Sequence, residues 1–411
     1  MKVIIKNSQI RGKIIAPPSK SYAIRLILCA FLYGRKTTIK NVGTCEDAKK
    51  AVDCVKSLGA AVYCRGCDIM IDSGALKSGV TLDVGDSAAL YRMLVAVTAA
   101  LGVNARFSLG ETLKNRDNSR YIDLMNAHGA GIDGGEVKGK LIGGEYVVDV
   151  TGTSQFLSGC MIALPLIGGA SVRPAGKTVS ASYVAMTIEV LSKFGIEIGN
   201  SDGLYFANAP SEIKSGLDLT VNGDWSAAAN MLSLGALCGK VTVEGLTSDA
   251  QGDKAIVDRL KDFGARVTTE GDSVTAESGE KKAFTADCAD CPDIVPELAA
   301  LAANARGKSL LKYVARLNGK ESRRVDNIMK SLAAVGAECD FDGQNITITG
   351  GKTHGANFDN VNDHRIVMMN ALLAASAEGR SVISGAECVT KSYPEFFEEF
   401  KNLCGAIDVE V

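Results

Sequence analysis

Lysine and arginine residues stand at or just before the starts of strongly apolar helical segments in this sequence. Residues 16–34 show the pattern, because Lys20, Ser21 and Arg25 open a run that is otherwise apolar. The amino-terminal end of a helix already carries partial positive charge, so cations there are locally unfavourable. The arrangement makes sense if a strongly anionic ligand binds at the helix start, where the cations and the free backbone amides act on it together.

The same placement of cations recurs along the chain. Further cations open or precede apolar helical segments at Arg92, Arg116, Lys320, Arg324, Arg365 and Lys391. Each alone could pair with a nearby carboxylate or be solvated, but their recurrence at the same stage of successive segments favours a shared anion site. The arginine fork matches carboxylate and phosphate groups, and lysine adds a point charge. We therefore expect small metabolites that carry both groups as ligands.

Hydroxyl and amide side chains occupy the same class of position, at Thr153, Ser154, Gln155, Ser180 and Tyr183. Hydroxyl groups and helix-start amides together can cradle a phosphate. Two acids stand near the cations, Asp293 before an apolar helix and Glu321 beside Lys320. Neighbouring cations lower the pKa of an acid unless burial dominates. Asp293 is thus a candidate general base and Glu321 a candidate proton-transfer group, although an N-cap and a solvated loop residue are equally ordinary roles for them.

The elements that must position these residues repeat six times. Strongly apolar helical segments end near Gly34, Gly102, Gly169, Gly239, Gly307 and Gly379. Amphipathic segments that follow them end near Gly59, Gly129, Gly195, Gly264, Gly336 and Gly405. The residue past a helix end often needs positive φ, which favours glycine. A short strand between the two helices and hairpin-like strands after the second complete a βαβαββ unit of about 70 residues, repeated six times.

The length of 411 residues predicts two domains rather than one compact core. Three units in each domain would bury three apolar helices together, with the sheets outside them. Pro17, Pro18 and Gly223 suit the connections between the domains. The predicted division is therefore residues 17–221 against residues 1–16 plus 222–411, with the helix starts of each domain facing a cleft.

Composition excludes several classes of protein. The formal net charge of −2 and the single Trp argue against nucleic-acid binding. Neither a signal segment nor a run of about 20 apolar residues occurs, so we expect neither secretion nor a membrane span. The 12 scattered cysteines are typical of reduced thiols in a cytoplasmic protein. Two C-x-x-C pairs, Cys64/Cys67 and Cys288/Cys291, lie too far apart in sequence to favour a four-cysteine zinc site.

Six short motifs occur in a characteristic order. They read PPSKSYAIR, TSQF, PD before an apolar helix, KES-x-R, NDHR and TKSYPEFF. Across residues 1–411 this combination resembles the family of 3-phosphoshikimate 1-carboxyvinyltransferase, or EPSP synthase. The resemblance implies an α/β fold, the two-domain inside-out α/β barrel with six repeats, three in each domain, and a hinged cleft. It also implies a cytoplasmic transferase, with no metal or cofactor, that acts as a monomer in the shikimate pathway.

The reaction that the resemblance implies is attack of the 5-hydroxyl of shikimate 3-phosphate on phosphoenolpyruvate, with loss of phosphate through a tetrahedral intermediate. Shikimate 3-phosphate would be held by Lys20, Ser21, Arg25, Thr153, Ser154, Gln155, Ser180, Tyr183, Asp293 and Lys320. Phosphoenolpyruvate would be held by Lys20, Arg92, Arg116, Gln155, Arg324, Arg365 and Lys391. The catalytic residues would be Lys20, Asp293, which takes the hydroxyl proton, and Glu321, which handles a proton at the methylene carbon.

The chain departs from the family pattern at several positions: Ala88, Asp117, Arg316 and Arg323 stand where glycine, proline, asparagine and aspartate are usual. The methyl group of Ala88 predicts a crowded phosphoenolpyruvate pocket. An inhibitor bulkier than that substrate, such as glyphosate, is therefore expected to bind poorly.

Two alternative functions remain on the same scaffold. UDP-N-acetylglucosamine 1-carboxyvinyltransferase carries a catalytic-loop cysteine, whereas residues 108–120 of this chain contain Arg116 and no cysteine. A non-catalytic anion-binding protein would not need Lys20, Asp293 and Glu321 together. The sequence therefore favours the shikimate substrate over both alternatives.

Overall fold

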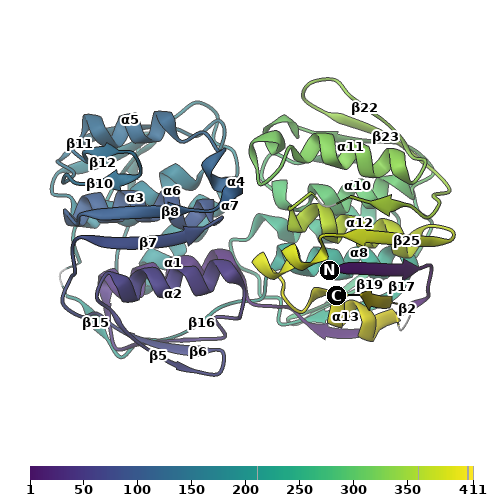
Figure 1. The fold of residues 1–411 in the computed structure, drawn as a ribbon, viewed down its shortest axis with the longest axis horizontal. Coiled ribbons are helices and arrows are strands. Elements are labelled where there is room, and N and C mark those ends of the chain that lie inside the picture. The colour runs from purple at the N-terminus through teal and green to yellow at the C-terminus, as the bar shows by residue number, and fades with distance from the viewer. Residues whose placement is uncertain (211, 360, 405–406, 411) are drawn as a thin grey trace. The chain divides into compact units, whose positions relative to one another are not determined.

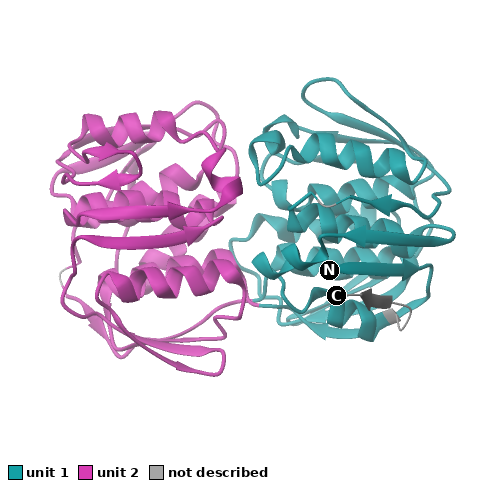
Figure 2. Cartoon of the chain, viewed as in Figure 1, with its two compact units in different colours: residues 1–17, 223–411 teal, residues 18–222 magenta. Residues whose placement is uncertain are grey.

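A computed structural model describes residues 1–210, 212–359, 361–404 and 407–410. The chain divides into two compact units, unit 1 with residues 1–17 and 223–411 and unit 2 with residues 18–222 (Figure 2). The boundaries expected from the sequence lie one residue earlier at each crossing. The chain passes between the units at Pro17–Pro18 and Asn222–Gly223. At Gly223 the backbone passes so close that a Cβ atom would lie 2.4 Å from the carbonyl oxygen of Gly245.

Unit 2 holds the elements of the first half of the chain (Figure 1). In chain order they are α1 (Lys20–Tyr33), β3 (Gly34–Arg35), β4 (Thr37–Lys40), α2 (Glu46–Ser57), β5 (Ala61–Arg65), β6 (Asp68–Asp72), β7 (Val80–Gly85), α3 (Ala88–Leu101), β8 (Ala105–Leu109), α4 (Glu111–Lys114), α5 (Ser119–Ala127), β9 (Ile132–Asp133), β10 (Glu136–Val137), β11 (Gly144–Asp149), α6 (Gln155–Ala163), the 3-10 turn η1 (Leu164–Leu166), β12 (Ala170–Ala175), α7 (Ala181–Lys193), β13 (Gly199–Ser201), β14 (Leu204–Phe206), β15 (Lys214–Ser215) and β16 (Asp218–Thr220).

Unit 1 begins with the first two strands and resumes after residue 222. Its elements are β1 (Lys2–Lys6), β2 (Ile10–Ile15), α8 (Trp225–Cys238), β17 (Gly239–Glu244), η2 (Gly252–Ala255), α9 (Ile256–Asp262), β18 (Arg266–Glu270), β19 (Ser273–Glu277), β20 (Thr285–Asp287), η3 (Pro292–Ile294), α10 (Val295–Ala303), β21 (Gly307–Lys312), η4 (Ala315–Gly319), α11 (Arg324–Ala334), β22 (Glu338–Phe341), β23 (Ile346–Gly350), β24 (Asn357–Phe358), α12 (His364–Ser376), β25 (Arg380–Ser384), η5 (Ala386–Lys391), α13 (Phe396–Cys404) and β26 (Ile407–Glu410).

Six four-stranded sheets in the described part of the chain share one pattern of connection. Their orders are β16-β4-β6-β5, β7-β8-β10-β9, β11-β12-β14-β13, β2-β17-β19-β18, β20-β21-β23-β22 and β24-β25-β1-β26. In every sheet the first two strands in this order are parallel, and the other two pairings are antiparallel. Strands β16 and β1 reach their sheets from distant parts of the chain, so each unit is closed by a strand remote in sequence.

The strongly apolar helices form the interior, as the sequence predicts. In unit 1, helices α8, α10 and α12 contact one another, and side chains such as Leu232, Leu298 and Met369 are fully buried. In unit 2, α3 packs on α6 and α1 packs on α7. A helix that is apolar on nearly all sides is stable only where protein surrounds it. None of the helices among the described residues is long and apolar enough to cross a lipid bilayer.

The glycines near helix ends serve two different purposes. The expected positive φ is confirmed after four of the apolar segments, at Gly102, Gly169, Gly307 and Gly379, and after the amphipathic helices, at Gly59, Gly129, Gly195, Gly264 and Gly336. It is wrong at Gly34 and Gly239, where φ is −119° and 164° and the backbone is extended. There a Cβ atom would lie 2.4 Å from Thr37 Oγ1 and 1.9 Å from the Ile10 carbonyl oxygen, so glycine permits close packing instead. Gly405 lies outside the described residues.

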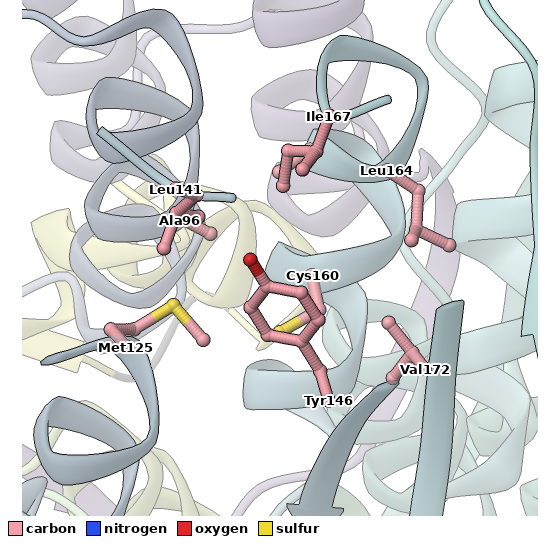
Figure 3. Close-up of a pocket in the computed structure, with 9 residues that line it drawn as sticks. Ala96, Met125, Leu141, Tyr146, Cys160, Leu164, Ile167 and Val172 are labelled. Atoms are coloured by element: carbon pink, nitrogen blue, oxygen red, sulfur yellow. The ribbon is translucent and has the colours of Figure 1, made fainter. Parts of the chain in front are cut away.

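One small apolar cavity lies in the core of unit 2 (Figure 3). Its volume is about 10 Å³, enough for about one water molecule. Met125, Tyr146 and Cys160 are among the side chains that line it, and the Tyr146 hydroxyl donates a hydrogen bond to the Ile142 carbonyl at 2.6 Å. The cavity is therefore a packing void and is too small for a metabolite.

Candidate active site

Arg324 is the centre of an ionic network in unit 1. Its side chain is 1% exposed, and it begins helix α11. The guanidinium donates to Asp363 Oδ2 at 2.9 Å, to Glu321 Oε2 at 2.5 Å and to Asp293 Oδ1 at 3.1 Å. Three carboxylates from three separate segments of the chain thus converge on one buried cation, in the geometry that suits the arginine fork.

Three more cations lie at the edge of this network. Lys320 Nζ and Arg365 Nε lie 3.5 Å and 3.9 Å from Asp293 Oδ1. Lys391 Nζ lies 3.5 Å from Glu321 Oε1. All the site residues that the sequence predicts in unit 1 are therefore brought together, namely Asp293, Lys320, Glu321, Arg324, Arg365 and Lys391.

The charged groups of this network shift one another's pKa values. Burial would raise the pKa of Asp293, but Lys320, Arg365 and Arg324 hold it well below its ordinary value. Burial lowers the pKa of Lys320, and Asp293 partly opposes that effect. Burial would lower the pKa of Arg324, but Asp363, Glu321 and Asp293 raise it instead. Asp293 is consequently an ionised carboxylate surrounded by cations.

In unit 2, Arg25 is held by uncharged acceptors. The residue is 2% exposed, and its Nε donates to Thr187 Oγ1 at 2.9 Å. Its NH2 donates to Ser158 Oγ and to the Tyr183 carbonyl, both at 3.3 Å. Burial lowers the Arg25 pKa to about 10, a value at which the group is still charged at neutral pH. Hydroxyl and carbonyl oxygens orient this cation without neutralising it.

Arg92 is oriented in the same way. Its Nε donates to Asn118 Oδ1 at 2.9 Å and its NH1 donates to Gln155 Oε1 at 2.8 Å. The guanidinium carbon lies 4.6 Å from the centre of the Phe156 ring, within range of a cation–π interaction. Two amides and an aromatic face therefore hold a second buried arginine of unit 2.

Lys20 forms an ion pair with an acid of unit 2. It opens helix α1, and its Nζ lies 3.2 Å from Asp47 Oδ2 in the first turn of α2. The Ser21 carbonyl accepts from Arg25 NH1 at 2.8 Å, which joins the start of α1 to the Arg25 cluster.

The remaining residues predicted in unit 2 lie near the starts of α6 and α7 and in the loop before α5. Thr153 Oγ1 accepts from the Gln155 amide at 3.2 Å, beside the N-cap Ser154 of α6. Ser180, the N-cap of α7, has a left-handed backbone with φ 54°. The Arg116 carbonyl accepts from Asn118 Nδ2 at 3.0 Å.

Comparisons with known proteins identify the family. The model of the EPSP synthase (3-phosphoshikimate 1-carboxyvinyltransferase) family matches residues 4–400. This chain belongs to that family, and the resemblance of its motifs is confirmed. Relatives named 3-phosphoshikimate 1-carboxyvinyltransferase from Methanocorpusculum labreanum and Thermococcus kodakarensis are 33% and 34% identical. The alignments cover 98% and 96% of this chain, and 98% of each relative.

Solved structures of the family share the fold. An EPSP synthase from Acinetobacter baumannii superposes with a TM-score of 0.82 at 21% identity, over 100% of both chains. The enolpyruvyl transferase NikO from Streptomyces tendae gives a TM-score of 0.78 at 17% identity, over 99% of this chain and 98% of that one. These likenesses establish the two-domain α/β fold of the family.

Several residues of the EPSP synthase site region were not found by sequence reasoning. They are Asp47, Asn118, Phe156, Ser158, Thr187 and Asp363, each in contact with a predicted residue. Helical spacing could have found Ser158 and Thr187, which follow Ser154 and Tyr183 by one turn. Asp363 directly precedes an apolar helix, and its side chain accepts from the Arg365 amide at 3.0 Å, so its N-cap position was a readable signal.

The departures from the family pattern occupy defined positions. Ala88 is the first residue of α3 and is 4% exposed. Arg316 donates to the Ala289 carbonyl. Arg323 pairs with Asp326 at 2.5 Å on the surface. The poor glyphosate binding expected from Ala88 stays a prediction.

Proposed function

We propose that this chain transfers the enolpyruvyl group of phosphoenolpyruvate to the 5-hydroxyl of shikimate 3-phosphate and releases phosphate, in the route to chorismate and aromatic amino acids. The observation that carries the proposal is the family match over residues 4–400. The convergence of Asp293, Glu321 and four cations on one buried network supports it, because the reaction needs proton-transfer groups beside anion-binding groups.

Phosphoenolpyruvate is proposed to bind Lys20, Arg92, Arg116, Gln155, Arg324, Arg365 and Lys391. Arg365 supports this role because it is 4% exposed and its NH1 has no hydrogen-bond partner among the described residues. A buried donor without a partner is unfavourable, so an anion that accepts from it would bind strongly. Arg92 supports it too, since Asn118, Gln155 and the face of the Phe156 ring fix the orientation of this buried cation.

Shikimate 3-phosphate is proposed to bind Lys20, Ser21, Arg25, Thr153, Ser154, Gln155, Ser180, Tyr183, Asp293 and Lys320. The main support for this binding site is Arg25, because Ser158 and Thr187 orient its buried charge without neutralising it. A phosphate placed there would gain a charge-assisted hydrogen bond.

The proton steps are proposed for Asp293 and Glu321. The substrate hydroxyl oxygen bonds to the central carbon of phosphoenolpyruvate as Asp293 takes the hydroxyl proton, and the methylene carbon gains a proton from Glu321. The methyl group then returns a proton, the carbon–oxygen bond to phosphate breaks, and the double bond re-forms. Lys320, Arg365 and Arg324 depress the Asp293 pKa, so substrate anions that engage these cations would make Asp293 a stronger base. Lys20 would neutralise charge that develops on the phosphate.

The finer architecture is part of the proposal. We propose the inside-out α/β barrel of six βαβαββ repeats, with three in each unit, the units acting as hinged domains around a cleft. The shared order and pairing of the six four-stranded sheets support this description. We further propose a cytoplasmic monomer that needs no metal or cofactor. Eleven cysteines of the described side chains are free thiols, and they fit a reducing compartment.

One assay separates the proposed function from its alternatives. Phosphate release from phosphoenolpyruvate is measured with shikimate 3-phosphate, with UDP-N-acetylglucosamine and with no acceptor. We expect release only with shikimate 3-phosphate. Release only with the nucleotide sugar would select the other carboxyvinyltransferase, and no release with either would indicate a binding protein.

Elution as a dimer in size-exclusion chromatography would contradict the proposed monomer.

A further inference from the structure

Glu297 is a buried carboxyl group that the proposed reaction does not use. It lies in the first turn of α10 and is 0% exposed, and neither of its carboxyl oxygens has a hydrogen-bond partner on another described residue, although its own backbone amide acts on it. Burying an ionised carboxylate without partners is very unfavourable, and burying a neutral one still costs free energy. The charge state of Glu297 therefore depends on the charged groups that surround it.

The cation that acts on Glu297 is Arg365. Arg365 lies on α12, which packs against α10, and each of the two groups shifts the other electrostatically. Arg365 is itself buried, with NH1 unpartnered and Nε 3.9 Å from Asp293 Oδ1. A proton on Glu297 therefore decides whether Arg365 faces one more negative charge from the protein, in addition to those of Asp293 and Asp253.

We propose that Glu297 is a positioning residue for phosphoenolpyruvate. While its buried carboxyl group keeps a proton, the charge of Arg365 remains available to the anionic substrate, and loss of that proton weakens binding. This inference rests on the proposed function, because it takes Arg365 to be a ligand of phosphoenolpyruvate.

The surroundings favour the neutral form of Glu297 near neutral pH. Burial raises its pKa to about 8; Arg365 opposes the rise, while Asp253 on η2 and Asp293 on η3 add to it. Asp253 is 3% exposed, and burial together with Asp293 raises its own pKa to about 7. Arg324 on α11, which also packs against α10, acts on Arg365. Glu297 is thus mostly protonated at neutral pH and ionised at alkaline pH.

The test compares substrate affinity at two pH values. Calorimetry gives the dissociation constant of phosphoenolpyruvate, with shikimate 3-phosphate present, one pH unit below and one above the Glu297 pKa. In the unsubstituted protein the constant should rise by about tenfold, because only about a tenth of the molecules keep the proton at the higher pH. Glu297→Gln should remove this rise, since its side chain stays neutral.

Glu399→Gln is the matched control. Glu399 lies in the same unit, and burial raises its pKa too, but its carboxylate accepts from the Tyr393 hydroxyl. This variant should keep the rise of the unsubstituted protein, and any effect of the ionisation of the substrate itself is common to all three proteins. An equal rise in the Glu297→Gln and unsubstituted proteins would overturn the inference.

A second measurement covers the case in which Glu297→Gln does not fold. In the unsubstituted protein labelled with ¹³C-glutamate, the Glu297 carboxyl resonance should titrate well above ordinary glutamates, and further up when phosphoenolpyruvate binds. A resonance that titrates in the ordinary range would overturn the inference. Absence of phosphate release in the acceptor assay would instead refute the proposed function, even if the affinity of the Glu297→Gln variant lost its pH dependence.

Discussion

At the scale of residues, two neighbouring arginines differ in how much of their side chains is buried. Arg324 has 1% of its side chain exposed and holds three carboxylates, whereas Arg323 has 72% exposed and holds Asp326 alone. An exposed ion pair adds little to stability, but removing one partner from a buried network leaves uncompensated charge. The two positions therefore serve different purposes despite their identical residue type.

Arg324→Met is expected to destabilise unit 1 by about 3–5 kcal/mol, because it leaves buried carboxylates without the cation that pairs with them. Arg323→Met should leave stability nearly unchanged. Urea unfolding followed by the fluorescence of Trp225 reports on this unit, since Trp225 is the only tryptophan of the chain and lies in α8. Equal unfolding midpoints for the two variants would contradict the network.

Lys20→Met is expected to reduce turnover by at least about 100-fold, because it removes a cation that neutralises substrate charge. The substitution would also leave the buried carboxylate of Asp47 without its cation, which lies 3.2 Å away in the unsubstituted protein. Adding Asp47→Asn should restore stability without restoring turnover, as measured by thermal unfolding and phosphate release. Lys56→Met, on the surface of α2, is the control, and near-normal activity of Lys20→Met would remove Lys20 from the mechanism.

At the scale of elements, remote strands complete the sheets. Strand β2, from the start of the chain, pairs in parallel with β17, more than 200 residues later. Their register places Gly239 opposite Ile10, and the helix α8 ends directly before this glycine. Space for the partner strand, rather than a left-handed turn, is why glycine stands there.

Gly239→Ala is expected to cost at least about 3 kcal/mol, since its Cβ atom would lie 1.9 Å from the Ile10 carbonyl oxygen and the two strands would have to separate. Gly271→Ala is the matched comparison, because φ is +61° there but nothing lies within 4 Å of the added atom. It should cost about 1–2 kcal/mol from backbone strain alone. Urea unfolding by Trp225 fluorescence measures both, and the reverse order would refute the close-packing explanation.

At the scale of the whole molecule, buried carboxyl groups link stability to pH with opposite signs. Asp293 has a depressed pKa, so it contributes stability that is lost as the pH falls through its folded value. Glu297 has a raised pKa, so the folded state keeps a proton that the unfolded state releases. Its contribution therefore declines as the pH rises from 4.5 to about 8 and is constant above that range.

The free energy of unfolding of the unsubstituted protein, relative to Glu297→Gln, is expected to fall across this range of pH. The difference isolates Glu297, because the other carboxyl groups are common to both proteins. Urea unfolding by Trp225 fluorescence at a series of pH values measures it. Parallel curves for the two proteins would show that Glu297 keeps an ordinary pKa.

The sequence by itself determined the residue types of the site, the regular alternation of apolar and amphipathic helices, and the family. Helix patterns, caps and motifs depend on residues near one another in the chain, so Lys20, Asp293 and Arg324 could be singled out without coordinates. Only the tertiary structure decided that Asp363 meets Arg324, that Gly239 faces Ile10 and that Glu297 is buried beside Arg365. Such pairings join segments that are distant in sequence, and the packing that buries them sets both their charge states and their partners.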